Sequence, residues 1–437
     1  MKIKRLISNQ SLSYIGIIYI LFGISYQFCI NIPRIISPIA FLFTLFLSCF
    51  HQKSNYLFKF ITIISLLSFF FPYRLFIVAL GIFLLGVGDY LFFKYLKKVN
   101  HHSLSLIIFS LTIIPSLFIT ITTIDPSLTL PIIRKLYNIK NTTTIIETGT
   151  HILSNNITLN ANLTYSKNYP NSYLDIYYTT TDLSKPTIIY LHKGGFLWGD
   201  KVPGNPLTMD NNFKNSTIYT FITNNYNVVS LDYALTPQNH YPTPIKQLHE
   251  GLKYLLDNSE KLNLNMSSII LIGQSAGANL ASSLTNLETN PDYASLLEEI
   301  PYLQGNQLKG LILEGGFYRS NNIGKTNNLL YDWLFYNMGR LYYQEIDLTN
   351  NSYLKETSVF NYVNSNYPKT FISDGNTATF WKEAQALDQK LTNLNVPHTL
   401  NYYPHSRIKL IHCYEEKGNI YSQQTQQNIL KFVQDLT

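Results

Sequence analysis

The sequence predicts two parts of different fold class: an all-α membrane domain of about five transmembrane helices, followed by an α/β domain with a mostly parallel sheet flanked by helices. Three observations support this prediction. The first 124 residues contain long apolar runs separated by short basic segments. The remaining sequence is more polar and contains short apolar runs, which are typical of buried strands. Several of these runs end in glycine-rich turns or lead into helix-like stretches.

The apolar runs of the N-terminal part have the composition of membrane-spanning helices. They are rich in Ile, Leu and Phe and occupy residues 11–31, 35–50, 56–71, 74–93 and 103–124. The second and third runs are shorter than the roughly 20 residues that a span requires, so four spans are an alternative to the preferred five. A secretory signal peptide contains only one such run. The sequence therefore predicts a polytopic membrane domain over residues 1–124.

Charge is distributed unequally between the two parts. Residues 1–124 carry a net charge of +9, with Asp89 as their single acid, whereas the remaining residues carry −2. With five spans, the basic residues of this part fall on one side of the membrane, except for Arg34 and Arg74. The positive-inside rule then predicts a cytoplasmic N-terminus and an extracellular location for everything after the fifth span. Because the basic character belongs to the membrane part, it does not indicate a nucleic-acid partner.

The membrane part shows no signature beyond anchoring. Asp89 lies within or near the fourth predicted span, where an ionisable residue is either functional or placed at the interface, and its neighbour Tyr90 favours the interface. The three cysteines, Cys29, Cys49 and Cys413, form no disulfide framework, since two fall in spans and one stands alone. No metal or cofactor is implied, and the oligomeric state is left open.

Ser275 is the candidate nucleophile. It stands at the centre of Gly-Gln-Ser-Ala-Gly, residues 273–277, between the apolar run 268–272 and the helix-like stretch 278–284. The sequence thus predicts a strand that turns sharply into a helix at this serine. The flanking glycines permit a strained turn and keep side chains away from the hydroxyl, and the helix N-terminus favours the negative charge that develops there.

Two other segments provide partners for this serine. The apolar run 186–191 leads into a loop with the glycine pair Gly194 and Gly195, whose N–H groups can join that of Ala276 around an oxyanion. The candidate base is His412, which follows the predicted strand 399–403 in a loop. His405 is the alternative base, because it lies closer to the end of that strand. His192 is interpreted as a structural residue of the glycine loop.

These motifs resemble the hormone-sensitive-lipase-like branch of the α/β-hydrolases, esterases and lipases marked by an H-G-G-G loop and a G-D-S-A-G elbow. Residues 192–195 match the loop, 273–277 the elbow, and 232–237 the D-Y-R-L-A-P stretch of this family. The resemblance spans about 174–433. It implies an α/β-hydrolase fold and a serine esterase or lipase acting on short to medium acyl esters.

The chain departs from the family pattern at three positions. Lys193 replaces the first loop glycine, Gln274 the acidic residue before the serine, and Ala278 a glycine. The first change leaves both remaining loop glycines to donate. The other two bear on subfamily and pocket shape.

The catalytic acid is assigned to Asp374, the only carboxylate in the turn 374–379 that follows the predicted strand 370–373. Ungapped matching to the family places the acid near Thr377 instead, so the assignment requires a shorter turn. Asp374 is equally well explained as an ordinary turn residue. Glu314, after another predicted strand, and Glu383, on the following helix, are the alternatives.

Together these inferences predict a membrane-anchored, extracytoplasmic serine esterase or lipase. Ser275 attacks a carboxylic ester, His412 transfers the proton, and Asp374 orients the histidine. The oxyanion is held by Gly194, Gly195 and Ala276. The substrate is left open among small acyl esters, lipids at the membrane surface and acetyl groups on glycans. The alternatives are a catalytically inactive hydrolase-fold binding or sensing module, and a membrane acyltransferase.

The predicted domain limits follow from the same patterns. Residues 1–124 form the membrane domain and 173–437 the catalytic domain. Between them, residues 125–172 are polar and are predicted to form a linker, a possible cap and the first strands. The aromatic segment 318–363 is a candidate for lining the acyl or alcohol pocket, or alternatively contains an amphipathic helix packed on the sheet.

Overall fold

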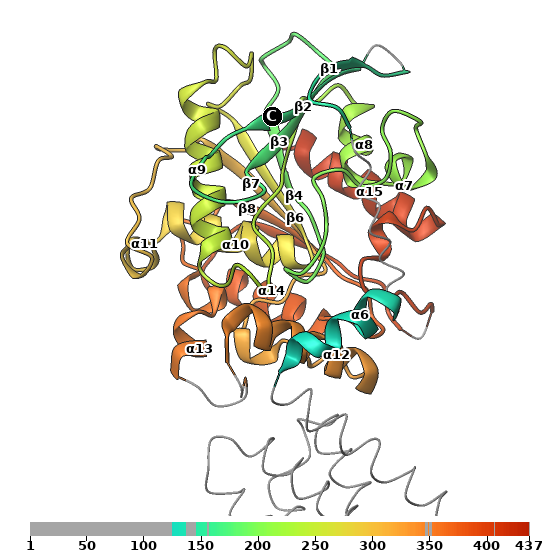
Figure 1. Cartoon of the computed structure of the whole chain (residues 1–437), viewed down its shortest axis with the longest axis vertical. Helices are drawn as coiled ribbons and strands as arrows, with labels where there is room; N and C mark the ends of the chain where they lie inside the picture. Colours follow the sequence, from blue (N-terminus) through green and yellow to red (C-terminus); the bar gives the residue numbers. More distant parts are fainter. Residues whose placement is uncertain are drawn as a thin grey trace, which may run out of the picture. The chain divides into compact units, whose positions relative to one another are not determined.

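The computed structural model of the chain describes residues 125–136, 146–154, 157–345, 348, 352–405 and 407–436 (Figure 1). The predicted membrane domain, residues 1–124, lies outside these described residues. Within the described ranges, no helix is both long and apolar enough to cross a membrane. The chain divides into two compact units, Met1–Tyr137 and Asn138–Thr437. All candidate site residues belong to the second unit.

The described part of the first unit is short. It contains the 3₁₀ helix η2 (Pro126–Thr129) and the helix α6 (Leu130–Leu136). The Asp125 side chain accepts a hydrogen bond of 2.8 Å from the backbone N–H of Ser127. Asp125 therefore caps the first turn, as acidic N-cap residues commonly do.

One mixed sheet organises the second unit (Figure 1). Its strands are β1 (Gly149–Ile152), β2 (Thr158–Thr164), β3 (Tyr173–Tyr178), β4 (Thr187–Leu191), β5 (Val228–Leu231), β6 (Ile269–Gln274), β7 (Leu308–Glu314), β8 (Lys369–Ser373) and β9 (His398–Asn401). Their spatial order is β1-β2-β3-β5-β4-β6-β7-β8-β9. The first three pairings are antiparallel, and all pairings from β5 to β9 are parallel. The carboxyl ends of the parallel strands therefore meet along one edge.

The central strands are buried on both faces, which explains their continuous apolar sequences. Every residue of β4 and β6 is buried. Because side chains alternate along a strand, Ile270 and Ile272 point to one face, and both belong to a core cluster with Ile429 and Phe432. The run Ile-Ile-Leu-Ile therefore packs against the helices on both faces of the sheet.

Helices cover both faces of the sheet (Figure 1). They are α7 (Asn211–Lys214), α8 (Thr217–Ile222), α9 (Thr243–Asp257), α10 (Ala276–Thr289), α11 (Pro291–Leu296), α12 (Leu329–Tyr343), α13 (Ser352–Glu356), α14 (Trp381–Asn393) and α15 (Ile420–Gln434). Short 3₁₀ turns are η4 (Ser320–Asn322), η5 (Val359–Tyr362) and η6 (Tyr414–Glu416). Helices α8 and α15 pack together on one face, whereas α9 and α10 pack together on the other. This arrangement confirms the α/β fold predicted for the catalytic part.

The sheet begins N-terminal to residue 173. Strands β1 and β2 fall in the polar segment 125–172, and β2 pairs with β3 in antiparallel fashion. Two apolar residues of β2, Leu159 and Ala161, are buried, and this alternation holds the strand on the sheet. The pairing shifts register between Asn160 and Leu163.

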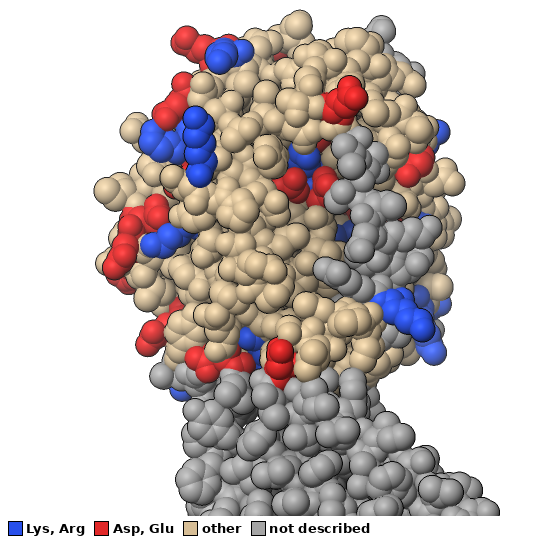
Figure 2. Space-filling view, viewed as in Figure 1, with Lys and Arg blue, Asp and Glu red and all other residues tan. Residues whose placement is uncertain are grey.

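Charges on the surface are mixed in sign. On the face shown in Figure 2, acidic and basic side chains lie interspersed, mainly toward the edges of the described part, around a broad area without charged groups. This face therefore carries no extended patch of a single sign.

Candidate active site

Ser275 lies in a strained turn between β6 and α10. Its backbone has φ 56° and ψ −114°, a conformation that L-residues rarely adopt. The neighbouring glycines are required sterically. A Cβ on Gly273 would lie 2.1 Å from the carbonyl oxygen of Gly277, and a Cβ on Gly277 would lie 2.1 Å from that of Leu191. The turn predicted from residues 273–277 is therefore present. It brings the start of α10 into close contact with the end of β4.

His412 contacts the Ser275 hydroxyl directly. Its Nε2 lies 2.8 Å from Ser275 Oγ, although the two residues are 137 positions apart in the sequence. Gly315, with φ 62°, follows β7 beside this pair, and a Cβ there would lie 3.2 Å from His412 Cε1. The absence of a side chain at Gly315 gives the imidazole its place against the backbone. A serine and a histidine in this geometry form a nucleophile and general-base pair.

Asn376 ties the turn after β8 to the loop that carries His412. Its Nδ2 donates to the carbonyls of Tyr403 and Ile408, at 2.7 and 2.9 Å, and its Oδ1 accepts from Leu410 N at 3.0 Å. The backbone N–H groups of Asn376 and Thr377 both donate to Leu410 O. These bonds hold the segment that ends at His412 against the turn that begins at Asp374.

Asp374 reaches His412 through another side chain. Thr379 Oγ1 lies 3.0 Å from His412 Nδ1 and forms a short hydrogen bond to Asp374 Oδ1. Asp374 Oδ1 also accepts from Gly375 N at 2.7 Å. Among the described residues, no ion pair joins Asp374 to His412. The predicted acid is therefore next to the predicted base, but with a threonine hydroxyl between them, which the sequence analysis did not single out.

Burial controls the protonation of both groups. Burial lowers the pKa of His412 to about 3, and the positive charges of Lys193 and Lys417 act in the same direction. Burial also raises the pKa of the Asp374 carboxyl well above its ordinary value; the Thr379 hydroxyl opposes this rise and the charge of Glu415 adds to it. The imidazole is accordingly held neutral, as a general base must be.

The glycine loop after β4 supplies backbone donors near Ser275. Gly194 has φ 135°, and a Cβ on it would lie 1.7 Å from Trp198 O, so only glycine fits. Within the described ranges, the N–H groups of Gly194, Gly195 and Ala276 donate to no protein acceptor. Gly277 brings the start of α10 to the end of β4, where this loop begins. Free N–H groups on both segments are what an oxyanion hole needs.

His192 supports this loop, as its structural interpretation requires. Its ring stacks on Tyr233 at 4.1 Å, and its Nδ1 lies 2.7 Å from the carbonyl oxygen of Lys193. The Tyr233 hydroxyl donates to His192 O at 2.9 Å. Tyr233 belongs to the stretch 232–237 that matched the family pattern, so this stretch holds the glycine loop in place.

Lys193 joins the glycine loop to the loop of the base. Its Nζ forms an ion pair with Glu416, and Glu416 also accepts from Thr217 N at 3.2 Å. The adjacent Glu415 accepts from Ser373 Oγ at 2.8 Å. Residues 415 and 416 form part of η6, directly after His412 and Cys413, so they anchor the base from its C-terminal side. The lysine that replaces a loop glycine therefore connects the glycine loop to the segment that follows His412.

The side chains of the two alternative acids have other partners. Glu314 is buried at the end of β7, where it accepts from Thr217 Oγ1 at 3.1 Å and Gln274 Nε2 at 3.2 Å. Glu383 binds Arg319 and accepts from the backbone N–H of Tyr318 and Arg319. His405 is exposed. Among the described residues, none of the three side chains bonds to Ser275 or His412, although the backbone carbonyl of Glu314 accepts from Ser275 N at 2.7 Å.

Helix α12, in the aromatic segment 318–363, borders the site. Phe335 lies edge-on to the His412 ring at 5.2 Å, and Phe380, before α14, does the same at 5.5 Å. Met338 is close enough to Gly195 that a Cβ there would lie 2.6 Å from its sulfur. Apolar side chains of α12 therefore line the approach to the base and to the glycine loop.

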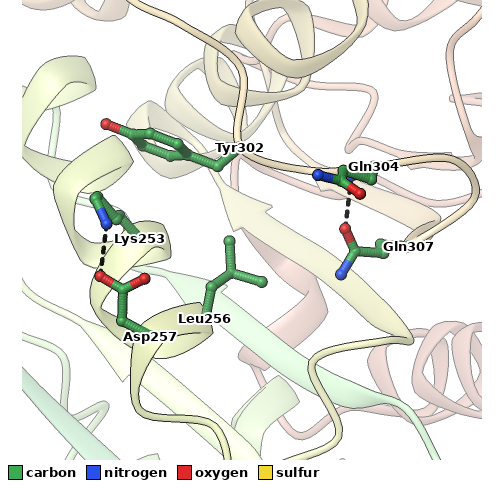
Figure 3. A pocket seen from close by; sticks show the side chains of 6 residues that line it. All are labelled: Lys253, Leu256, Asp257, Tyr302, Gln304 and Gln307. Carbon is green, nitrogen blue, oxygen red and sulfur yellow. Dashed lines mark hydrogen bonds and ion pairs between the residues drawn. The ribbon is translucent and has the colours of Figure 1, made fainter.

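A hollow of about 500 Å³ lies at the edge of the sheet opposite Ser275 (Figure 3). It is lined by Lys253, Leu256, Asp257, Tyr302, Gln304 and Gln307. The segment 302–307 precedes β7 and so lies at the amino end of the parallel strands, opposite Ser275. Lys253 pairs with Asp257 at 2.6 Å, and the Tyr302 ring is stacked on His249 at 4.1 Å. This hollow is separate from the serine site.

Comparisons with known proteins agree with this geometry. The sequence model of the BD-FAE family matches residues 174–391, which include the glycine loop, Ser275 and Asp374 but end before His412. Acetyl esterases of Salmonella paratyphi B and Salmonella agona are each 35% identical over 104 residues, covering 24% of this chain and 29% of theirs. The chain thus spans less than a third of the length of these curated relatives.

The solved structures extend the comparison to the whole fold. Esterase B from Lactobacillus rhamnosis has a TM-score of 0.55 with 17% sequence identity, covering 72% of this chain and 94% of that one. Similarity at this level of identity establishes the fold. The second unit accordingly has an α/β-hydrolase fold, as the resemblance implied.

Proposed function

We propose that this chain, with its α/β-hydrolase fold, is a serine-dependent carboxylic ester hydrolase. The hydrogen bond of 2.8 Å between Ser275 Oγ and His412 Nε2 carries the proposal. The strained turn at Ser275 and the free N–H groups of Gly194, Gly195 and Ala276 support it. The similarity to esterases and acetyl esterases points to the same reaction.

The reaction proceeds in two acyl-transfer steps. His412 Nε2 takes the proton of Ser275 as Oγ bonds to the ester carbon, and the carbonyl oxygen becomes an oxyanion held by the backbone donors. The alcohol leaves with the proton from His412, which gives an acyl-serine. Water then repeats the sequence and releases the acid. The neutral imidazole that burial maintains is the form that starts each step.

The substrate class that fits best is a short acyl ester. The approach to Ser275 is bordered by Phe335, Phe380 and Met338, and Met338 packs on Gly195. Apolar side chains so close to the base favour a small apolar acyl group over a long or charged one. The partial similarity to acetyl esterases agrees with this preference.

A fluorophosphonate probe tests the proposal directly. Only a serine activated by a base reacts with it, so the purified protein is expected to become labelled at Ser275 and nowhere else. Peptide mapping of the labelled protein identifies the residue. A protein that remains unlabelled would instead be a binding or sensing module with an inert site, whereas labelling at another serine would place the nucleophile elsewhere.

The same proposal includes a membrane location for the enzyme. The charge distribution over residues 1–124 favours a cytoplasmic N-terminus and an extracellular catalytic unit. A protease added to intact cells is therefore expected to cut between residues 125 and 172 and to release a fragment that carries Ser275, detected by an antibody to the C-terminal part. Protection in intact cells with cleavage after lysis would reverse the orientation.

A further inference from the structure

The polar groups of the site form a line of four side chains. Ser275 Oγ lies 2.8 Å from His412 Nε2, and His412 Nδ1 lies 3.0 Å from Thr379 Oγ1. Thr379 Oγ1 in turn bonds Asp374 Oδ1. Ser275, Thr379 and Asp374 are buried, the last two each 1% exposed, and His412 is partly buried.

The single proton of the Thr379 hydroxyl decides the state of the imidazole. Asp374 Oδ1 also accepts from Gly375 N at 2.7 Å and so carries no proton itself, although burial raises the pKa of the carboxyl. An oxygen without a proton only accepts hydrogen bonds, so the Thr379 hydroxyl donates to Asp374 Oδ1. Its oxygen then accepts from His412 Nδ1–H. With the ring proton on Nδ1, Nε2 carries the lone pair that receives the proton of Ser275. The opposite direction would put the ring proton on Nε2 and leave no base.

We infer that Thr379 is a positioning residue, which connects Asp374 to His412 and fixes the imidazole in the tautomer that activates Ser275. This inference rests on the proposed esterase function. When His412 takes the serine proton, both ring nitrogens carry hydrogen, and the Nδ1–H remains bonded to Thr379. The carboxylate stabilises the imidazolium through the hydroxyl without receiving a proton. Every proton lost by Ser275 is thus returned to the leaving alcohol by His412.

Other charged groups also face this line of side chains. The charges of Lys193, in the glycine loop, and of Lys417, after the loop that carries His412, lower the pKa of His412. The charge of Glu415 raises the pKa of Asp374. Asp374 in turn raises the pKa of the buried Tyr318 hydroxyl. These groups are unchanged in a Thr379 variant, so differences in pH dependence report on the threonine.

The test compares Thr379→Val with Thr379→Ser. Valine keeps the shape but lacks the hydroxyl, so we expect kcat and the rate of fluorophosphonate labelling at Ser275 to fall about a hundredfold or more, within the range of general acid–base effects. KM should change little, because Thr379 does not touch the ester. Serine restores the hydroxyl and should stay within about tenfold of the unmodified protein. Thr357→Val, which removes another buried hydroxyl bonded to Ser320 and Leu354, is the matched control and should be without effect.

The pH profile separates this role from a structural one. Protonation of His412 as the pH falls removes the base and produces the acid limb of kcat/KM. Burial raises the pKa of Asp374 and lowers that of His412. In Thr379→Val the imidazolium loses the hydroxyl that connects it to the carboxylate, so the acid limb of kcat/KM should move to lower pH, by about one unit or more. A variant that is only less stable would keep the limb in place.

Two further variants keep the inference testable should valine prevent folding. Thr379→Ala should show the same loss and the same shift of the acid limb. Asp374→Asn leaves a carbonyl oxygen to which Thr379 still donates, so it should cost about a hundredfold, less than the roughly ten-thousandfold of a directly paired triad.

The outcomes distinguish this inference from the proposed function. If the unmodified protein is not labelled at Ser275, the esterase assignment itself fails. If it is labelled and Thr379→Val reacts just as fast, while Asp374→Asn loses about ten-thousandfold, the acid contacts His412 directly and the role given to Thr379 is wrong.

Discussion

Replacement of Ser275 by alanine is expected to reduce the hydrolysis of a short-chain p-nitrophenyl ester by several orders of magnitude. The substitution removes the oxygen that forms the acyl-enzyme while it leaves the glycine loop and its donors intact, so only the residual catalysis by the oxyanion hole remains. The measurement is kcat/KM by release of nitrophenol. Circular dichroism should be unchanged, since alanine loses only one oxygen atom.

A nearby serine provides the matched control for this prediction. Ser282 lies on α10, the helix that begins directly after Ser275. Its side chain is buried, and its hydroxyl has no hydrogen-bond partner among the described residues. Ser282→Ala should therefore keep normal activity. Retained hydrolysis in the Ser275 variant would remove this residue as the nucleophile, and a loss in both variants would point to a disturbed α10 instead.

The substitution His412→Ala should approach Ser275→Ala in severity, while His405→Ala should be mild. His412 is the group that contacts Ser275 Oγ, at 2.8 Å, whereas His405 is exposed. Without the imidazole, nothing takes the proton from the serine and nothing returns it to the leaving alcohol. The two histidines lie close together in the sequence, so the pair of variants separates a catalytic role from a general effect of the loop. Both are measured by kcat/KM with the same ester.

The double variant Ser275→Ala/His412→Ala tests whether the two residues act as one unit. Residues of one catalytic unit have strongly non-additive effects, so the second substitution should add almost nothing to the first. A further large loss in the double variant would show that His412 acts independently of Ser275. Greater severity of His405→Ala than of His412→Ala would transfer the base role to His405.

The elbow at Ser275 was predictable because its determinants are local. The apolar run before it, the glycines on both sides and the helix-forming stretch after it all lie within about twenty residues. The strain at φ 56° belongs to that same short pattern, and the glycine at position 277 permits the close approach to Leu191. The strands were recognisable for a similar reason, since burial on both faces leaves continuous apolar runs.

The path from acid to base was not predictable in the same way. Asp374 was chosen as the only carboxylate of its turn, and the structure does place it beside His412. The connecting hydroxyl of Thr379 is uncharged and follows the acid by five positions, so nothing in its sequence context marks it. Asn376, which joins the acid turn to the base loop, acts over 27 to 34 residues. Polar contacts over such separations depend on the fold as a whole.

The contact between Lys193 and Glu416 was also not predictable from the sequence. In the sequence, Lys193 is only a departure from a glycine motif, and its partner lies 223 residues away. Asp374 was preferred to Glu314 and Glu383 only for its place in a turn after a strand, and the partners of the two glutamates could not be read from the sequence. Glu314 and Glu383 have their own hydrogen-bond partners in the structure, and those partners come from segments far apart in the chain.

The separation of 137 residues between Ser275 and His412 also determines how long after the serine the histidine is synthesised. Ribosomes add roughly 5 to 20 residues per second, so the nucleophile precedes its base by on the order of ten seconds. During that interval the nascent chain already contains the glycine loop, the elbow and the strands that hold them. It lacks β9 and the loop that carries the imidazole. The Ser275–His412 pair can therefore form only after this last segment of the catalytic unit has been synthesised.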